Sequence, residues 1–244
     1  MRLYITGDDE RSMALKQQAL NNGHEMTEKT PDAVVLPLPK AGVKDMKRYF
    51  PQGQRIIGGK TETVLQEMMH KEKWVFENVL EDETFLLENA RLTAEGAVWK
   101  AMNTRKKALC YAECMVVGYG RIAKFLTQML RGIGSRVTVA ARSEKARKEA
   151  GENSIGISQM QEKIGEMDYV FNTVPFLVLT ENVLLHAKKD VVMMELASAP
   201  YGIDMHAAER MGMKIHIEGG LPGRYCPMDA AKVWLDYIER SGKI

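Results

Sequence analysis

The chain has few cysteines, and their number and spacing exclude two kinds of framework. Cys110, Cys114 and Cys226 are three, so they cannot close a complete set of disulfides. No Cys-x-x-Cys pair and no Cys/His ligand spacing is present, so we expect no structural zinc and no other metal site. We therefore expect a protein of a reduced compartment, the cytoplasm.

The sequence also lacks an excess of charge of either sign. It holds 34 lysine and arginine residues against 32 aspartate and glutamate residues, a formal net charge of +2 in 244 residues. Such a balance gives no general attraction to nucleic acid or to an anionic membrane. We expect neither partner, and any anion that binds must be held by a local site.

Long hydrophobic runs are absent as well. The longest stretch without a charged residue, from Tyr169 to Thr180, is far shorter than the ~20 residues that span a bilayer as a helix. Residues 2–6 are typical of a short strand and not of a secretory signal. A soluble protein is the expectation.

Short β-branched runs alternate with amphipathic stretches, which is typical of α/β folds with parallel sheets. Residues 1–103 are predicted to form a small α/β domain of flavodoxin-like type, with a first helix capped by Ser12. A long helix is predicted to begin at Thr93, a good N-cap, with Glu95 in its first turn, where the helix dipole favours a carboxylate. The domain boundary is placed just after it, near Asn103.

Residues 104–228 are predicted to form a Rossmann dinucleotide-binding domain. Six strands separated by helices are expected there, which is the strand count of that fold. The strands are placed at 114–117, 136–140, 155–157, 169–174, 191–196 and 214–217. Residues 229–244 are predicted to be a C-terminal helix that packs back on the N-terminal domain.

A glycine-rich loop follows the first strand of this second domain. It reads Gly118-Tyr119-Gly120-Arg121-Ile122-Ala123, a G-x-G-x-x-A pattern between a strand and a helix. Gly118 permits the tight turn and Gly120 lets the backbone approach a pyrophosphate at the helix N-terminus. We assign residues 118–122 to cofactor binding.

The end of the second strand indicates which dinucleotide binds. An NAD site usually has Asp or Glu about 20 residues after the glycines, but here Arg142 and Ser143 stand at that place, followed by Lys145. A guanidinium and a hydroxyl can hold the 2′-phosphate of NADP. The alternative for Arg142 is an ordinary solvated loop residue.

The later strand ends should line the same cleft. Asn172 either orients the nicotinamide or substrate, as a catalytic residue, or closes a turn before proline. Ser198 is expected to bind substrate, and Asp204 to cap the next helix. Further cofactor contacts are expected from Thr173, Val174, Pro175, Leu196, Ala197 and Gly220, and further substrate contacts from Leu221 and Pro222. None of the five histidines pairs with these motifs, so no Ser-His-Asp system is expected.

These residues resemble the A subunits of bacterial dipicolinate synthases from Glu88 to about Ala231. The more specific signature combines Leu-Ala-Ser and Pro-x-Gly-x-Asp with a later Gly-Leu-Pro-Gly. The matching segments are 93–96, 118–123, 141–143, 172–175, 196–204 and 220–223, with Pro227.

The resemblance implies an N-terminal α/β domain, a Rossmann domain and NADP-dependent oxidation of a dihydrodipicolinate-type heterocycle to pyridine-2,6-dicarboxylate. It implies a branch of lysine biosynthesis, a partner that is a flavoprotein-like B subunit, and the mother cell of a sporulating bacterium. Ala199 and Tyr201 depart from the family, which usually has Arg and Gly there, and the N-terminal domain is shorter.

A more distant resemblance is to D-2-hydroxyacid dehydrogenases, through residues 89–95. Those enzymes need an Arg after the fifth strand and a His after the sixth, and here Ser198 and Leu221-Pro222 stand at those places. The electrophile and general acid for reducing a keto acid are therefore missing.

Two carboxylates of a substrate need donors. We expect them from Thr93 and the first N–H groups of its helix, with Ser198 and Asn172 adding hydrogen bonds. Glu95 is either the proton acceptor or only a first-turn acid. The alternatives are another NADP-dependent oxidoreductase acting on a keto or imino acid, or a non-catalytic protein that only binds NADP. A homo-oligomer is expected in each case.

Overall fold

The computed structural model describes residues 1–38, 40–46, 50–105 and 107–242. The chain forms two compact units, one of Met1–Leu92 with Pro222–Ile244 and the other of Thr93–Leu221. We call them unit 1 and unit 2. The division falls inside one long helix, α3 (Glu83–Thr104), and not after it near Asn103 as the sequence suggested. The second division precedes residue 228, so the segment after Leu221 belongs to unit 1.

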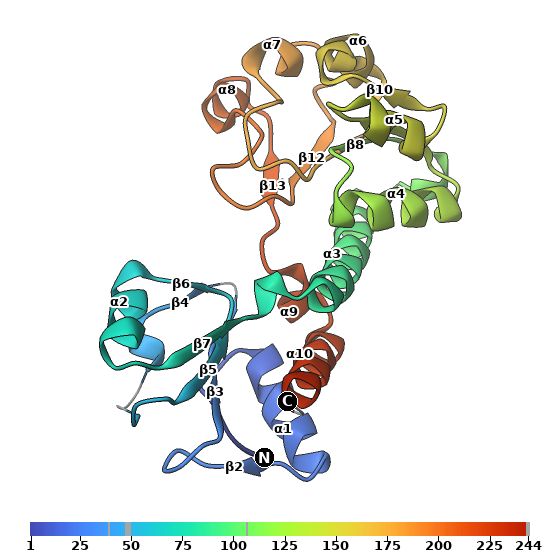
Figure 1. The fold of residues 1–244 in the computed structure, drawn as a ribbon. Coiled ribbons are helices and arrows are strands. Elements are labelled where there is room, and N and C mark those ends of the chain that lie inside the picture. The colour runs from blue at the N-terminus through green and yellow to red at the C-terminus, as the bar shows by residue number, and fades with distance from the viewer. Residues whose placement is uncertain (39, 47–49, 106, 243–244) are drawn as a thin grey trace. The chain divides into compact units, whose positions relative to one another are not determined.

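Unit 1 is built on a five-stranded parallel sheet in the order β2-β1-β3-β5-β7, the strand order of flavodoxin-like folds. Its strands are β1 (Arg2–Ile5), β2 (Glu25–Met26), β3 (Ala33–Val35), β5 (Arg55–Gly58) and β7 (Val75–Asn78). Two further strands, β4 (Lys40–Ala41) and β6 (Lys60–Thr61), form a separate parallel ladder (Figure 1).

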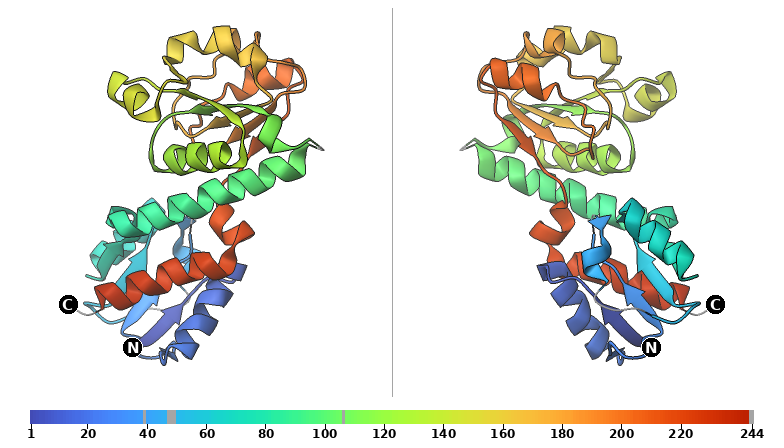
Figure 2. Two further views of the ribbon diagram at one scale, coloured as in Figure 1. Left: turned by 90° about the vertical axis from the view of Figure 1, so that its right-hand side faces the viewer. Right: turned by 90° about the vertical axis from the view of Figure 1, so that its left-hand side faces the viewer.

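Helices cover both faces of the unit 1 sheet. On one face, α1 (Glu10–Asn21) and α10 (Pro227–Ser241) lie side by side (Figures 1 and 2) and share a core with Leu3 and Ile5. On the other, α2 (Thr63–Lys71) packs with Tyr4 and Val34. Alternate residues of β1 thus point to opposite cores. Asp9, and not Ser12, caps α1, since its carboxylate accepts the Ser12 N–H at 3.1 Å.

Unit 2 is built on a six-stranded parallel sheet in the order β10-β9-β8-β11-β12-β13. Numbered by their sequence order within the unit, this is 3-2-1-4-5-6, the Rossmann order. The strands are β8 (Glu113–Val117), β9 (Arg136–Ala140), β10 (Ser154–Ile155), β11 (Tyr169–Asn172), β12 (Val192–Glu195) and β13 (Ile215–Ile217). The predicted fold class, α/β with a Rossmann domain and a smaller α/β domain, is confirmed.

The helices of unit 2 pack on both faces of this sheet, where two separate cores form. Strands buried on both faces read as continuous apolar runs, which is why they could be predicted. The helices are α4 (Arg121–Ile133), α5 (Glu144–Ala150), α6 (Met160–Lys163), α7 (Glu181–Leu184) and α8 (Met205–Arg210), while α9 (Leu221–Tyr225) begins where unit 2 ends. Short 3₁₀ turns lie at Val43–Asp45, Val79–Glu81, Leu109–Tyr111, Ile157–Gln159 and Ile164–Glu166.

Helix α3 begins ten residues earlier than predicted. The Asp82 carboxylate accepts the Phe85 N–H at 2.7 Å, so the helix starts at Glu83. Thr93 is therefore a buried residue in the middle of the helix, and its N–H lies in no helix terminus. The expected anion site at a helix N-terminus beside Thr93 is wrong, and Glu95 is an exposed mid-helix residue. No helix in the described ranges is long and apolar enough to cross a membrane.

Candidate functional site

The glycine loop after β8 has a backbone that only glycine adopts easily. Gly118 has φ of +98°, and a Cβ placed there would lie 2.5 Å from Thr173 Oγ1 and 2.8 Å from Val174 Cγ2. Both contacts are too short for any real side chain, so Gly118 is required twice over. Thr173 is itself held by its hydroxyl, which donates to the Val117 carbonyl at 2.8 Å.

The start of α4 leaves room for a ligand. Gly120 is the N-cap of α4 and forms no side-chain cap, and a Cβ added to it would meet no atom within 4 Å. The first N–H groups of a helix lack intrahelical acceptors and carry a partial positive charge. A pyrophosphate is the ligand that such an opening beside a glycine turn accommodates.

The loop after β9 is basic and well fixed. Arg147 donates to the Ala141 and Arg142 carbonyls at 3.0 and 2.8 Å, which holds the loop in place. The Arg142 side chain is exposed, and its guanidinium lies 5.7 Å from the centre of the Phe176 ring. Ser143 caps α5 by accepting the Ala146 N–H at 3.2 Å. The serine hydroxyl hydrogen remains able to reach a phosphate.

These two loops enclose a cavity of about 200 Å³ at the carboxyl ends of the strands. Its lining residues are Gly118, Tyr119, Ala141, Arg142, Ser143, Ala146, Ile157, Val174, Phe176 and Val178. No carboxylate is among them. The structure therefore brings together the predicted glycine loop and the predicted basic loop, while Lys145 and Pro175 lie outside this lining.

Phe176 is the residue of this cavity that sequence reasoning missed most plainly. Its side chain is 47% exposed, which is unusual for a phenylalanine, and its ring lies beside Arg142. The signal was available, because Phe176 directly follows the predicted segment 172–175. Ala146, Ile157 and Val178 are small or aliphatic and carried no signal of their own.

Asn172 is fully buried and has both ends of its amide engaged. Its Nδ2 donates to Glu195 at 2.7 and 2.9 Å and to the Val174 carbonyl at 2.9 Å, while its Oδ1 accepts the Val174 N–H at 3.2 Å. No donor is left for a nicotinamide or a substrate. The structure contradicts the expected catalytic contact and shows an Asn that closes a turn.

Glu195, which sequence reasoning did not single out, is the centre of this network. Its buried carboxylate also accepts the backbone N–H groups of Ala197, Gly202 and Ile203 at 3.0, 2.9 and 3.2 Å. Burial raises the pKa of the Glu195 carboxyl above its ordinary value, although the N–H groups of Gly202 and Asn172 act in the opposite direction. A side chain at Gly202 would collide with Asn172 Nδ2 at 2.5 Å, so the network also requires this glycine.

The loop that Glu195 anchors carries Ser198 on its exposed side. The Ser198 carbonyl accepts the Tyr201 N–H at 3.2 Å, which closes a turn. Tyr201 has φ of +68°, a left-handed conformation that favours glycine. Leu196 is only 7% exposed and packs in the core, so its side chain cannot contact a cofactor as expected.

The segment after β13 is placed less favourably for substrate than expected. Leu221 is 2% exposed and packs in the core of unit 2, which contradicts a substrate contact by its side chain. Pro222 is buried and belongs to unit 1. Gly220 has φ of +66° and an open environment. Asp204 caps α8 as predicted, accepting the Ala207 N–H at 2.9 Å.

A buried arginine in unit 1 was also missed. Arg11 is 7% exposed, donates to the Leu38 carbonyl at 2.7 Å and lies 4.0 Å from an Asp9 oxygen. Burial lowers the pKa of Arg11 from its ordinary value. Its guanidinium ties α1 to the segment that follows β3.

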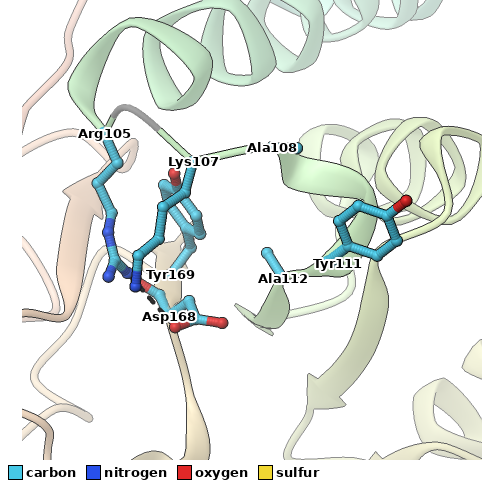
Figure 3. Close-up of a pocket in the computed structure, with 7 residues that line it drawn as sticks. All are labelled: Arg105, Lys107, Ala108, Tyr111, Ala112, Asp168 and Tyr169. Atoms are coloured by element: carbon cyan, nitrogen blue, oxygen red, sulfur yellow. Dashed lines mark hydrogen bonds and ion pairs between the residues drawn. The ribbon is translucent and has the colours of Figure 1, made fainter.

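A further cavity of about 320 Å³ in unit 2 lies at the opposite, amino ends of β8 and β11 (Figure 3). Arg105 pairs there with Asp190 at 2.7 Å and with Asp168 at 3.4 Å. Burial acts to raise the pKa of Asp168, but the Glu113 N–H and nearby cations outweigh it and hold the pKa below the usual range. Its charges are thus neutralised within the chain, on the edge away from the glycine loop. Across the part of the chain that is described, no group of three or more His, Cys, Asp or Glu could hold a metal ion.

The strand order, the glycine turn and the open start of α4 define unit 2 as a Rossmann domain of the NAD(P)-binding class. Residues 83–197, just under half of the chain, match the family model for the NAD-binding domain of D-isomer specific 2-hydroxyacid dehydrogenases. The fold is therefore that of a dehydrogenase.

Within that class, the chain is similar to the A subunit of dipicolinate synthase. It is 26% identical to that protein of Bacillus subtilis (strain 168) over 188 residues, which are 76% of this chain. The match spans 63% of the length of that relative. The resemblance predicted from the sequence is confirmed.

Solved structures share the fold over nearly the whole chain. The A subunit of Bacillus halodurans dipicolinate synthase has a TM-score of 0.87 at 23% identity, covering 98% of this chain and 96% of that one. Its Bacillus subtilis counterpart has a TM-score of 0.82 at 19% identity, covering 98% and 95%. A transhydrogenase from Sinorhizobium meliloti has 0.75 at 18%, covering 98% and 84%.

Proposed function

We propose that this protein is an NADP-dependent oxidoreductase that oxidises a dihydrodipicolinate-type heterocycle to pyridine-2,6-dicarboxylate. The observation that carries the proposal is the sequence match to the A subunit of dipicolinate synthase over 76% of the chain. The glycine loop and basic loop of unit 2 supply a matching cofactor cleft.

The residues present fit a dinucleotide. Gly118 and the start of α4 would hold the pyrophosphate, because the turn excludes side chains and the helix end is open. Bound NADP supplies the acceptor for a hydride. The choice of NADP over NAD rests on Arg142 and Ser143, and on the absence of a carboxylate in the lining.

The chain's own work on the substrate is mainly positioning. Oxidation to an aromatic ring lowers the energy of the product, so orientation of the ring contributes more than acid–base catalysis. Ser198 is exposed on a turn that Glu195 fixes, and we assign it a hydrogen bond to substrate. Glu95, exposed on α3, is the proposed proton acceptor.

The reduction of a keto acid in the manner of D-2-hydroxyacid dehydrogenases is disfavoured despite the matching family model. The turn after β12 presents Ser198 and Ala199 where an electrophilic Arg is needed, and Leu221 after β13 is buried. Neither an electrophile nor a general acid stands at these positions.

The same proposal includes partners and setting. We propose that the partner is a flavoprotein-like B subunit, that this chain forms a homo-oligomer, and that it acts in the cytoplasm of the mother cell during sporulation, on a branch of lysine biosynthesis. The Bacillus subtilis relative is named as one lettered subunit of its synthase, which supports the existence of a partner.

The test is turnover by the purified chain. Dihydrodipicolinate synthase product is generated freshly in the presence of NADP, and the ultraviolet absorbance of dipicolinate is followed with and without the B subunit. We expect dipicolinate and NADPH to appear together. Failure to form dipicolinate under both conditions, with NADP binding demonstrated, would contradict the proposal.

A further inference from the structure

Unit 1 has its own cavity, at the carboxyl end of its sheet. The cavity has a volume of about 430 Å³, and β5 and β7 end beside it at Gly58 and Asn78. Ligands of open parallel sheets bind beyond the carboxyl ends of the strands. The lining consists of Lys40, Gly59, Lys60, Thr61, Gln66, Phe76, Asn78 and Leu80.

Two lysines face each other across this cavity's small ladder. Lys40 of β4 is paired in register with Lys60 of β6, and the next pair, Ala41 with Thr61, is buried. Side chains of residues paired in register lie on the same face, so both lysines share the exposed face (Figure 1 shows the two strands). Like charges placed directly opposite each other destabilise a strand pair.

Nothing in the described chain offsets this repulsion. Neither ammonium group forms a hydrogen bond or ion pair with a described residue, and the lining contains no aspartate or glutamate. The contrast with Arg105 is direct, because that cation is paired with Asp168 and Asp190. A local arrangement that costs stability and has no partner among the described residues is typical of a functional site.

The remaining walls are fixed and partly apolar. Gln66 donates to the Thr61 hydroxyl at 3.1 Å, and Asn78 accepts the Leu80 N–H at 3.1 Å, so both amides are held in place. Phe76 adds an aromatic surface. Two cations beside a ring match a small, flat acid with two carboxylates.

We propose that Lys40 and Lys60 bind the two carboxylates of a small cyclic dicarboxylic acid in this cavity. The choice of a pyridine-2,6-dicarboxylate-like ligand rests on the proposed function, whereas the anion site rests on the lysine pair alone. This site takes the place of the helix terminus at Thr93, which the structure does not contain. Inorganic phosphate is also a small, multiply charged anion and is the competing ligand.

The test is calorimetric titration of the full chain, without NADP, by dipicolinate and separately by phosphate. The variants are Lys40→Gln, Lys60→Gln and both together, with Lys71→Gln as the control, since Lys71 is a lysine at the end of α2 outside the cavity. A hydrogen bond to a charged group contributes about 1.5–3 kcal/mol. We therefore expect each single change to weaken dipicolinate binding about tenfold or more, and Lys71→Gln to leave it unchanged.

The proposal is overturned if the wild type does not bind dipicolinate, if the double variant binds it as tightly as the wild type, or if phosphate binds more tightly than dipicolinate. Thermal unfolding of each variant with and without NADP shows that the fold and the cofactor site are intact. Lysine-dependent binding without any oxidation would leave this site standing and refute the proposed function alone.

Discussion

The amide of Asn172 donates to both carboxylate oxygens of Glu195, at 2.7 and 2.9 Å, in a fully buried site. The two residues end neighbouring strands, β11 and β12, and are paired in register. The bond joins the strand ends and leaves the other lone pairs of Glu195 to hold the turn that carries Ser198. An acidic side chain thereby shapes the edge of the cofactor cleft without facing it.

Replacing Glu195 by alanine leaves the Asn172 amide and three backbone N–H groups without an acceptor. Each unsatisfied buried donor costs about 1–3 kcal/mol, with partial relief from water. We predict a fall of about 3 kcal/mol or more in the free energy of unfolding, measured by urea denaturation. Glu195→Gln retains one acceptor oxygen and should fall less. Equal losses in the two variants would contradict this account.

The raised pKa of Glu195 predicts a pH dependence with a definite sign. A carboxyl that binds its proton more tightly in the folded than in the unfolded state adds stability below the unfolded pKa, and this is lost as pH rises through the folded pKa. We predict that wild type loses stability relative to Glu195→Gln as pH rises through the folded pKa in parallel urea titrations. A difference that grows with pH would show that the folded pKa is lowered.

The two glycines of the loop should respond differently to alanine. Gly118→Ala meets Thr173 and Val174 at a positive φ, so we predict a loss of stability of about 1–3 kcal/mol together with loss of NADP binding. Gly120→Ala meets open space, so the melting temperature should change little while NADP binding weakens. The comparison fails if both variants melt like the wild type.

Arg142 should select NADP over NAD. Removing a charge-assisted contact to the 2′-phosphate is expected to weaken NADP binding about tenfold or more and to leave NAD binding unchanged. The measurement is the thermal stabilisation of Arg142→Ala by each nucleotide. Lys148→Ala is the control, because Lys148 is an exposed cation on α5 that pairs with Glu144. Greater stabilisation of the wild type by NAD would refute this role.

Tyr201 occupies a backbone conformation that glycine adopts without strain. Tyr201→Gly and Tyr201→Ala both remove the ring, but only alanine keeps a Cβ at φ of +68°. We predict that the glycine variant is about 1 kcal/mol more stable than the alanine variant by chemical denaturation. An alanine variant of equal or greater stability would be the opposite of this expectation.

Most of unit 2 could be predicted from the sequence because its strands are buried on both faces and are separated by clear turns. The glycine loop and the basic loop after β9 were found from local patterns. The start of α3 was not, since Thr93 and Asp82 are both suitable caps. Packing of a row of small buried residues, Ala90, Ala94, Ala97 and Ala101, extends the helix through Thr93.

The site residues that were missed or misassigned depend on neighbours distant in sequence. Asn172 was assigned to the cleft because its partner, Glu195, lies 23 residues further along the chain. Lys40 and Lys60 are brought together by strands of two residues each, which are too short to show any periodicity. Leu196 and Leu221 follow strand ends, where one residue decides between core and cleft.

The central claim is tested most directly by counting products. Freshly generated dihydrodipicolinate-type substrate is given to wild type and to Arg142→Ala with limiting NADP, and dipicolinate and NADPH are quantified at intervals. The account predicts one NADPH for each dipicolinate formed by the wild type and a raised NADP requirement in Arg142→Ala. Dipicolinate formation at the same rate with and without NADP, or none by the wild type, would contradict it.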